Sequence, residues 1–363
     1  MPSDASDPTV AVFDLGGTWF RWGCYSASRG LLESRRVPAL NYLAHPRSSA
    51  LELQEAMLEF ILTHLWEMKN SAHHAITAVG VSVGAPVNVH NGTVLGSGPL
   101  WGPSAGPFPL HERLRGALPE LECHVVNDIT ALLARYMQGD VHYSKTMLIT
   151  VSSGVGSRLF DHRNRRIPYE GEHGVQGEIG HLVCPFEIGG RRIERRCECG
   201  GWNHLNAFAS GRGIAATLKA LPSLEAGCAD LLADCAASWE QADDDYRLTA
   251  FQVALAQGRG SALALLEAFV TPLVRILATA LTLDPEIGRI VMTGGVVHGL
   301  GTYYRDALQR VFLREELYQI TAHDPAFLMR RLHWEEPDDF SGLRGAGLYA
   351  VGVNREGRNG LSN

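Results

Sequence analysis

Short apolar runs separated by glycine-rich turns mark the start of the chain. Val10–Phe13 and Trp19–Tyr25 are two such runs, and Asp14–Thr18 lies between them. Apolar runs on either side of a glycine pair predict a β-hairpin. The same pattern returns where Met147–Val151 leads into the turn at Ser152–Ser157. This echo predicts two related lobes, each opening with a hairpin, with a cleft between them.

Strands and helices alternate along the rest of the chain. Short apolar runs predict further strands at 75–83, 123–126 and 290–292. Apolar residues spaced three or four apart predict helices at 49–68, 246–256, 260–282 and 342–353, and one after residue 128 with Leu132, Leu133 and Tyr136 on one face. Such alternation is typical of an α/β fold.

Composition and charge narrow the class of protein. The chain has 363 residues, of which 45% are hydrophobic and 20% charged. A single core stops growing at roughly 250–300 residues, so two lobes are expected. The net charge of -7 argues against a nucleic-acid surface. No apolar signal segment or uninterrupted apolar run of roughly 18 residues is visible, so we expect a cytoplasmic protein without a membrane partner.

Three glycine-containing turns follow strands and suit phosphate binding. Glycines let backbone N–H groups approach phosphate oxygens, and a hydroxyl adds a further donor. A carboxylate such as Asp14 can organise Mg²⁺ through water. Plain hairpin or strand-to-helix turns are the alternative explanation. The candidate ATP- and phosphate-binding residues are Asp14, Gly16, Gly17, Thr18, Ser153, Gly154, Gly156, Gly294 and Gly295.

The pair Asn127-Asp128 follows a predicted strand. A carboxylate at the carboxyl end of a strand in an α/β lobe lies where ligands bind. Asp128 can deprotonate a hydroxyl that attacks a γ-phosphate, and Asn127 can hold the same substrate. The local alternative is that Asp128 caps the following helix, a position that aspartate favours.

A group of cysteines and histidines suits a metal. His181, Cys197, Cys199 and His204 offer the two nitrogen and two sulfur ligands of a tetrahedral zinc site. Cys184 is a competing fourth ligand. Free thiols beside surface histidines are the alternative.

In this order and spacing, the motifs resemble those of the ROK family of sugar kinases and related repressors. The resemblance runs from about residue 10 to about residue 350. The family pattern is a DxGGT turn, an ND pair, a GTGxG turn, an ExGH motif, CxCGxxGCxE and a late GG. These correspond to Asp14–Thr18, Asn127-Asp128, Ser152–Gly156, Glu178–His181, Cys197–Asn206 and Gly294-Gly295.

The resemblance implies a two-lobed, actin-like and ribonuclease-H-like ATPase fold. It implies a small lobe at 1–127 and a larger lobe at 128–341 that carries a zinc loop at about 177–206. Residues 342–363 would form a helix that returns to the small lobe, plus a tail. The family likeness also implies ATP with Mg²⁺ in the cleft, a structural Zn²⁺ and a homodimer or tetramer.

Family likeness also implies roles for individual residues. Asp128 would be the catalytic base and Glu178 would bind sugar hydroxyls. His181 would contact the sugar with one ring nitrogen and zinc with the other, since metal on one nitrogen fixes the donor state of the other. The expected substrate-binding residues are Asn127, Glu178, His181, Gly84 and Asn206.

Several positions depart from the family pattern. His204 replaces the last cysteine, and Asn206 replaces a glutamate that contacts the sugar ring in glucokinase-like members. Pro99 stands where an asparagine usually precedes Leu-Trp, and Ser152 and Ser153 replace the first Gly-Thr of the second turn. Changes at substrate-contacting positions indicate a substrate other than glucose.

These features predict ATP-dependent phosphorylation of a primary hydroxyl of a hexose or sugar-like polyol. The alternative substrate is a C7-cyclitol, valiolone- or valienol-like, of aminocyclitol biosynthesis. The alternative of another class is a sugar-binding regulator without kinase activity. A repressor's N-terminal helix-turn-helix is not expected, because only nine residues precede the first predicted strand.

Overall fold

The computed structural model describes residues 7–71, 75–137, 142–224, 239, 241–315 and 317–359, with backbone alone for 353–359. The chain divides into two compact units. The first unit comprises Met1–Val141, Arg165–Gln176 and Asp338–Asn363, and the second comprises His142–Asn164 and Gly177–Pro337.

A five-stranded mixed sheet forms the centre of the first unit. Its order is β3-β2-β1-β4-β5. The strands are β1 (Thr9–Leu15), β2 (Trp19–Ser26), β3 (Gly30–Pro38), β4 (Ile76–Val83) and β5 (Glu122–Asn127). β2 is antiparallel to both β1 and β3, whereas β1, β4 and β5 run parallel.

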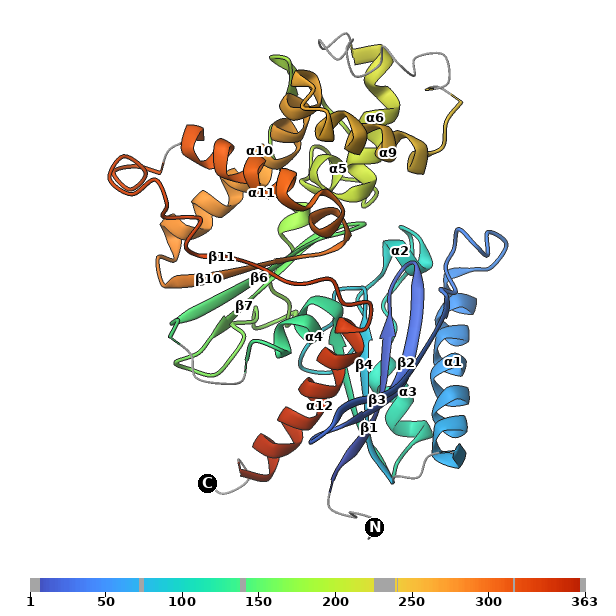
Figure 1. Ribbon diagram of the computed structural model, residues 1–363. Helices are drawn as coiled ribbons and strands as arrows, with labels where there is room; N and C mark the ends of the chain where they lie inside the picture. Colours follow the sequence, from blue (N-terminus) through green and yellow to red (C-terminus); the bar gives the residue numbers. More distant parts are fainter. Residues whose placement is uncertain are drawn as a thin grey trace. The chain divides into compact units, whose positions relative to one another are not determined.

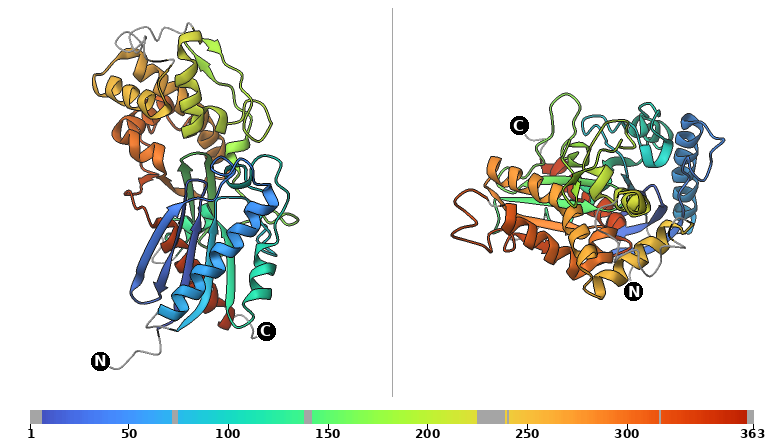
Figure 2. Two further views of the ribbon diagram at one scale, coloured as in Figure 1. Left: turned by 90° about the vertical axis from the view of Figure 1, so that its right-hand side faces the viewer. Right: turned by 90° about the horizontal axis from the view of Figure 1, so that it is seen from above.

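Helices cover both faces of this sheet (Figure 1). They are α1 (Ala50–Ser71), α2 (Gly98–Trp101), α3 (Leu110–Ala117), α4 (Asp128–Ala134) and α12 (Ser341–Asn359). Phe13 and Val81 point to a core shared with α1 and α3, while Val12 packs with Ala346 and Ala350 of α12. In the view that brings α1 to the front, α12 lies behind the sheet (Figure 2, left). Because side chains alternate between the two faces of a strand, β1 contributes residues to two hydrophobic cores, one on each side of the sheet.

α4 packs against α12 within the first unit. A side-chain carbon at Gly345 would lie 2.0 Å from the carbonyl oxygen of Ala131, so glycine is needed for this close approach of the two helices. The larger lobe was expected to begin at residue 128, whereas α4 lies in the first unit.

The second unit has a four-stranded sheet of order β11-β10-β6-β7. The strands are β6 (Lys145–Val151), β7 (Val155–Asp161), β10 (Ile287–Thr293) and β11 (Leu332–Trp334). Among the described residues of this unit, the helices are α5 (Asn206–Ala209), α6 (Gly211–Leu224), α9 (Asp244–Ala256), α10 (Gly260–Leu283) and α11 (Gly295–Glu315). The stretch between β7 and α5 holds only the 3₁₀ helix η1 (Ile179–His181) and the short strands β8 (Glu187–Ile188) and β9 (Arg191–Arg192).

Both sheets repeat one pattern of pairing. In each, a hairpin is followed by two parallel strands, β2-β1-β4-β5 in the first unit and β7-β6-β10-β11 in the second. The two hairpins predicted from the glycine-rich turns are confirmed as β1–β2 and β6–β7.

Two helix ends differ from their predictions. α4 ends at Ala134, and Tyr136 lies in a following turn where its N–H donates to the carbonyl oxygen of Leu133 (2.8 Å). Such three-residue turns are common where a helix tightens at its end. α12 continues to Asn359, beyond the predicted end at residue 353.

α10 is long and apolar enough to meet the length and composition of a membrane span, with mean hydropathy 1.7 over its most apolar window. No such segment was expected from the sequence. Half of that window is buried within the protein, and Phe269, Leu273 and Leu277 of α10 belong to the core. Core helices satisfy the same criteria, so this is weak evidence for a membrane.

Candidate active site and metal centre

The parallel strands β1, β4 and β5 end side by side in the first unit. Leu15 pairs with Val83, and Val83 pairs with Asn127. The next residues are therefore neighbours: a side-chain carbon at Gly84 would lie 3.5 Å from Cα of Gly16 and 3.6 Å from Oδ2 of Asp128. The carboxyl ends of parallel strands are where α/β proteins bind ligands.

Asn127, rather than Asp128, is the N-cap of α4. Its Oδ1 accepts hydrogen bonds from the N–H groups of Ile129 (2.9 Å) and Thr130 (3.3 Å). Its Nδ2 donates to the carbonyl oxygen of Ala85 (2.9 Å) and to Oδ1 of Asp128 (2.8 Å). The Ile129 N–H also donates to Oδ1 of Asp128 (2.9 Å). The cap thus orients the Asp128 carboxyl.

These four hydrogen bonds occupy both hydrogens and both lone pairs of the Asn127 amide. The geometry is that of a residue that positions Asp128. None of these bonds involves a substrate, so the substrate contact expected for Asn127 stays a prediction.

Asp14 is buried near the end of β1. Its carboxylate accepts hydrogen bonds from Ser82 Oγ (3.0 Å) and Arg21 Nη1 (3.2 Å). Burial raises the pKa of Asp14, although Arg21 and Ser82 favour its charged form. A side-chain carbon at Gly342 would lie 2.4 Å from the carboxyl carbon of Asp14, so glycine lets the first turn of α12 reach this group. The positive end of the helix dipole favours an anion there.

Residues outside the turn after β1 make contacts that fix the backbone of Gly17 and Thr18. Asn41 Nδ2 donates to the carbonyl oxygen of Gly17 (2.9 Å), and the Ala39 N–H donates to that of Thr18 (3.0 Å). A side-chain carbon at Gly17 would lie 2.6 Å from Cβ of Pro99. Thr18 is exposed at the tip. The backbone of this turn is therefore fixed while its hydroxyl stays accessible.

The second hairpin turn is fastened by Asn206. The Val155 N–H donates to Oδ1 of Asn206 (2.7 Å), and a side-chain carbon at Gly154 would lie 3.7 Å from the same oxygen. Ser153 is exposed in the turn, whereas Gly156 lies buried in β7 opposite Thr150. The strand resumes at Val155, so Gly156 is outside the turn to which the sequence analysis assigned it.

Two helix starts adjoin this turn in the second unit. The Gly211 N–H, at the start of α6, donates to the carbonyl oxygen of Ser152 (2.7 Å). Gly294, just before α11, has φ +108°, and a side-chain carbon there would lie 2.4 Å from the carbonyl oxygen of Val151. Gly295 opens α11 with open space at its α-carbon. Backbone N–H groups at helix starts suit anion binding.

Gly177 and Glu178 lie against β7. The Ser157 N–H donates to the carbonyl oxygen of Gly177 (2.9 Å), and Gly177 has φ +77°. Oε1 of Glu178 lies 3.5 Å from Nη1 of Arg158, whose side chain is 1% exposed. Arg158 was not predicted as a site residue, although a charged residue within the largely buried strand Val155–Asp161 is the signal that marks it.

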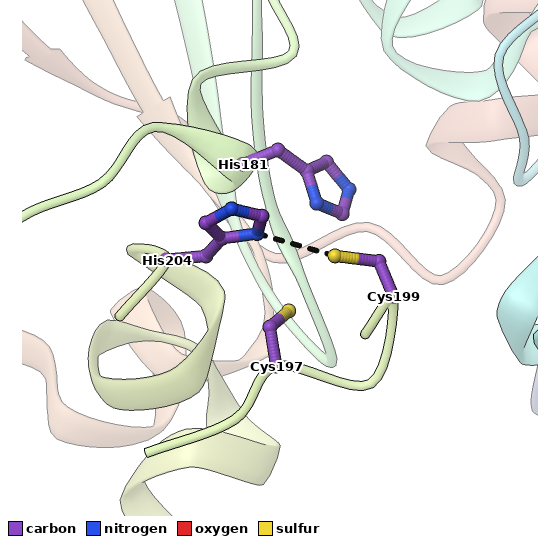
Figure 3. A group of neighbouring side chains, drawn as sticks. All are labelled: His181, Cys197, Cys199 and His204. Carbon is purple, nitrogen blue, oxygen red and sulfur yellow. Dashed lines mark hydrogen bonds between the residues drawn. The ribbon is translucent and has the colours of Figure 1, made fainter. Parts of the chain in front are cut away.

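His181, Cys197, Cys199 and His204 come together in the second unit, with their side chains pointing toward one another (Figure 3). One ligand atom from each residue lies within 4.8 Å of the others. Sγ of Cys199 lies 3.1 Å from Nδ1 of His204, and the two imidazole rings are perpendicular. Two nitrogen and two sulfur donors are a set that tetrahedral zinc prefers, and the spacing of roughly 3.3–3.8 Å between its ligand atoms lies within the 4.8 Å that these atoms span.

The backbone shapes this cluster. A side-chain carbon at Gly201 would lie 2.3 Å from the His204 ring, so glycine makes room for the imidazole. Burial lowers the pKa of His181 and raises that of Cys197. Cys184 is buried in the hydrophobic core and does not join the cluster. His204, and not Cys184, is therefore the fourth member of this cluster, and its role as a zinc ligand stays a prediction.

The family model described as the ROK family matches residues 10–351. The chain belongs to the ROK family. A 2-epi-5-epi-valiolone 7-kinase of Actinoplanes sp. is 36% identical over 351 residues, which cover 94% of this chain and 92% of that protein. A C(7)-cyclitol 7-kinase of Streptomyces hygroscopicus subsp. limoneus is 33% identical over 219 residues, 60% of this chain and 59% of that protein.

A solved ROK hexokinase from Thermus thermophilus is similar in fold. It aligns with a TM-score of 0.65 at 22% identity, covering 96% of this chain and 99% of that chain. The fold of this ROK chain is that of the two-lobed sugar kinases of the actin-like class, as the repeated hairpin-led sheets indicate.

Proposed function

We propose that this ROK protein is an ATP-dependent kinase that phosphorylates a hydroxyl of a cyclitol or sugar, with Asp128 as the general base. The observation that carries the proposal is the Asp128 carboxyl at the joined ends of β1, β4 and β5, oriented by Asn127 and beside Gly16 and Gly84. Phosphoryl transfer depends on positioning, charge stabilisation and a base, and the chain offers groups for each.

Within the first unit, Asp128 would accept the proton of the attacking hydroxyl. The fixed turn Gly16–Thr18 would direct N–H groups and the Thr18 hydroxyl at phosphate oxygens. Asp14 would hold Mg²⁺ through water. ATP, bound with Mg²⁺, supplies the transferred phosphoryl group.

Within the second unit, Ser153 and Gly154 would contact phosphate, and Gly294 and Gly295 would lie against the nucleotide. Glu178 and His181 would bind hydroxyls of the acceptor. The cluster of His181, Cys197, Cys199 and His204 would hold a structural Zn²⁺, which would close a loop with little secondary structure of its own.

A C7-cyclitol is the acceptor that we favour over a hexose. The relative that is 36% identical over 94% of this chain is named as a kinase of 2-epi-5-epi-valiolone. The departures at Asn206 and Pro99 from the glucokinase-like pattern support an acceptor other than glucose.

A panel assay tests the proposal. Purified protein with Mg-ATP is incubated with 2-epi-5-epi-valiolone, glucose, N-acetylglucosamine and N-acetylmannosamine, and ADP formation is followed. We expect the largest kcat/KM with the cyclitol. Preference for a hexose would keep the kinase but reject the cyclitol, whereas saturable binding without ADP formation would support the sugar-binding regulator instead.

A further inference from the structure

Arg158 is a buried guanidinium in the middle of β7. Its side chain is 1% exposed, and its Nη1 donates to the carbonyl oxygen of Ser157 (3.0 Å). Burying a charged group is costly unless other groups compensate it. A carboxylate stands within reach, because Oε1 of Glu178 lies 3.5 Å from the same Nη1.

The backbone around Glu178 is built to bring it there. A side-chain carbon at Gly177 would lie 2.1 Å from the carbonyl oxygen of Ser157, and Gly177 has φ +77°. Both the N–H and the Oγ of Ser157 donate to the Gly177 carbonyl oxygen, at 2.9 and 3.1 Å. Only glycine fits this contact, and the close approach of Gly177 to β7 places Glu178 beside Arg158.

The two sides of Glu178 differ. Oε1 is buried and makes no hydrogen bond with the part of the chain that the structure describes, while its side chain as a whole is 34% exposed. One oxygen therefore faces a buried cation, and the rest of the side chain remains accessible. A carboxylate with an ion pair on one side and open on the other is suited to accept a hydrogen bond from a hydroxyl in a defined direction.

We infer that Arg158 is a positioning residue that orients Glu178 toward the hydroxyl groups of the acceptor. This inference rests on the proposed function, since it assigns the acceptor to Glu178. A neutral side chain at position 158 would leave Glu178 without this cation and let its carboxylate turn away. Partners that orient metal-ligating side chains are worth about 10- to 100-fold in affinity or activity, and we expect an effect of similar size for Glu178.

Arg158→Met tests the inference by steady-state kinetics against both substrates. We expect the KM for the acceptor to rise about 10- to 100-fold, while the KM for ATP and the zinc content stay unchanged. Arg158→Lys keeps the charge and is expected to restore part of the loss. If the methionine variant does not fold, the acceptor KM of the lysine variant is compared with that of the wild type instead.

Arg247→Met is the matched control. Arg247 lies on α9 of the same unit, is 2% exposed, and bonds the carbonyl oxygen of Trp239 and Asp244. Its loss is expected to lower Tm without changing either KM. If Arg158→Met leaves the acceptor KM unchanged, or raises the KM for ATP as much as the KM for the acceptor, Arg158 has no positioning role.

Wild-type turnover separates this inference from the proposed function. If the wild-type protein phosphorylates no acceptor, the proposed function fails, and crystal structures of wild type and Arg158→Met decide the positioning role alone. A displaced Glu178 carboxyl in the variant supports it, and an unchanged carboxyl overturns it.

Discussion

At the scale of single residues, the start of α4 shows how neighbouring side chains divide two tasks. Asn and Asp are about equally good helix caps, so local sequence cannot say which of Asn127 and Asp128 takes that position. The structure gives the cap to Asn127, which also holds Asp128 through Nδ2. Asp128 is thereby removed from the capping role that its local sequence favoured.

Asp128→Asn is the residue-scale test of the base. We expect kcat to fall roughly 10²–10⁴-fold, because the amide cannot accept the proton of the attacking hydroxyl. Tm should change little, since the cap is Asn127. The measurement is initial-rate kinetics with a thermal melt of the same sample.

Glu112→Gln is the control for the loss of a negative charge in the first turn of a helix, here α3 of the same unit. It should keep wild-type kcat. Wild-type turnover by Asp128→Asn would refute the assignment of the base.

Asn206 is a second residue whose partners were not predictable. The sequence places it at a substrate-contacting position, whereas its Oδ1 accepts the Val155 N–H of the hairpin turn. Asn206→Ala removes this oxygen as the acceptor for the Val155 N–H, which destabilises the turn by about 1–3 kcal/mol. We therefore expect KM for ATP to rise about tenfold, with a smaller change in KM for the acceptor, measured by varying each substrate in turn.

Asn164→Ala removes a similar amide from an exposed turn of the same unit, where it bonds Asp161, and should change neither KM. The reverse outcome for Asn206→Ala, a raised acceptor KM with unchanged ATP KM, would mean that Asn206 contacts the acceptor as the resemblance implied.

At the scale of elements, the loop from Gly177 to Asn206 has little regular structure to stabilise it. Cys199→Ser is expected to lose stoichiometric zinc and to lower Tm, because metal binding in such loops contributes directly to folding. Metal analysis of the purified protein checks the first effect and a thermal melt the second.

Cys184→Ala is the matched control, since Cys184 is buried outside the cluster. It should retain zinc. Wild-type protein without zinc, or loss of zinc from Cys184→Ala alone, would contradict the proposed metal centre.

The ion pairs between α10 and α11 should make the free energy of unfolding depend on pH. Burial tends to raise the pKa of Glu267, but hydrogen bonds from Arg314 and Arg310, both 2.7 Å, outweigh it and hold the pKa below 4.5. A lowered folded pKa stabilises the fold above the unfolded value, and that stability is lost as pH falls through the folded pKa. Glu267→Gln should therefore lower the unfolding free energy by about 1 kcal/mol near neutral pH.

The difference between Glu267→Gln and wild type should shrink as pH falls below about 4.5, measured by urea unfolding at several pH values. Glu59→Gln, at an exposed glutamate of α1, is the control for the loss of a surface carboxylate and should leave the unfolding free energy at neutral pH close to the wild-type value. A difference that does not depend on pH would contradict the role of the ion pairs.

Sequence patterns predicted the elements with strong apolar signals and missed those without. β1, β2, α1, α9 and α10 carry long apolar runs or stripes and lie close to their predicted bounds. β3 was missed because no residue of Gly30–Pro38 is fully buried and the strand includes the charged residues Glu33, Arg35 and Arg36, as edge strands often do. Side-chain partners such as Arg158 with Glu178 depend on packing between segments and leave no local pattern.

At the scale of the whole molecule, the echo of two glycine-rich hairpins was the most informative feature of the sequence. It predicted a duplicated architecture, and both sheets repeat the same order of one hairpin and two parallel strands. The match to the ROK family covers residues 10–351 and therefore includes both sheets. The cytoplasmic location and the dimeric or tetrameric state remain predictions.

Product analysis of a single reaction tests the proposed kinase activity and the role of Asp128 together. Wild-type protein, Mg-ATP and 2-epi-5-epi-valiolone are incubated together and followed by phosphorus NMR, with Asp128→Asn in parallel. Asp128-dependent phosphoryl transfer predicts a new phosphomonoester signal that grows with ADP in the wild-type reaction and is lost in the variant. A folded, zinc-containing wild-type protein that forms no phosphate ester with this cyclitol or with any sugar of the panel would contradict it.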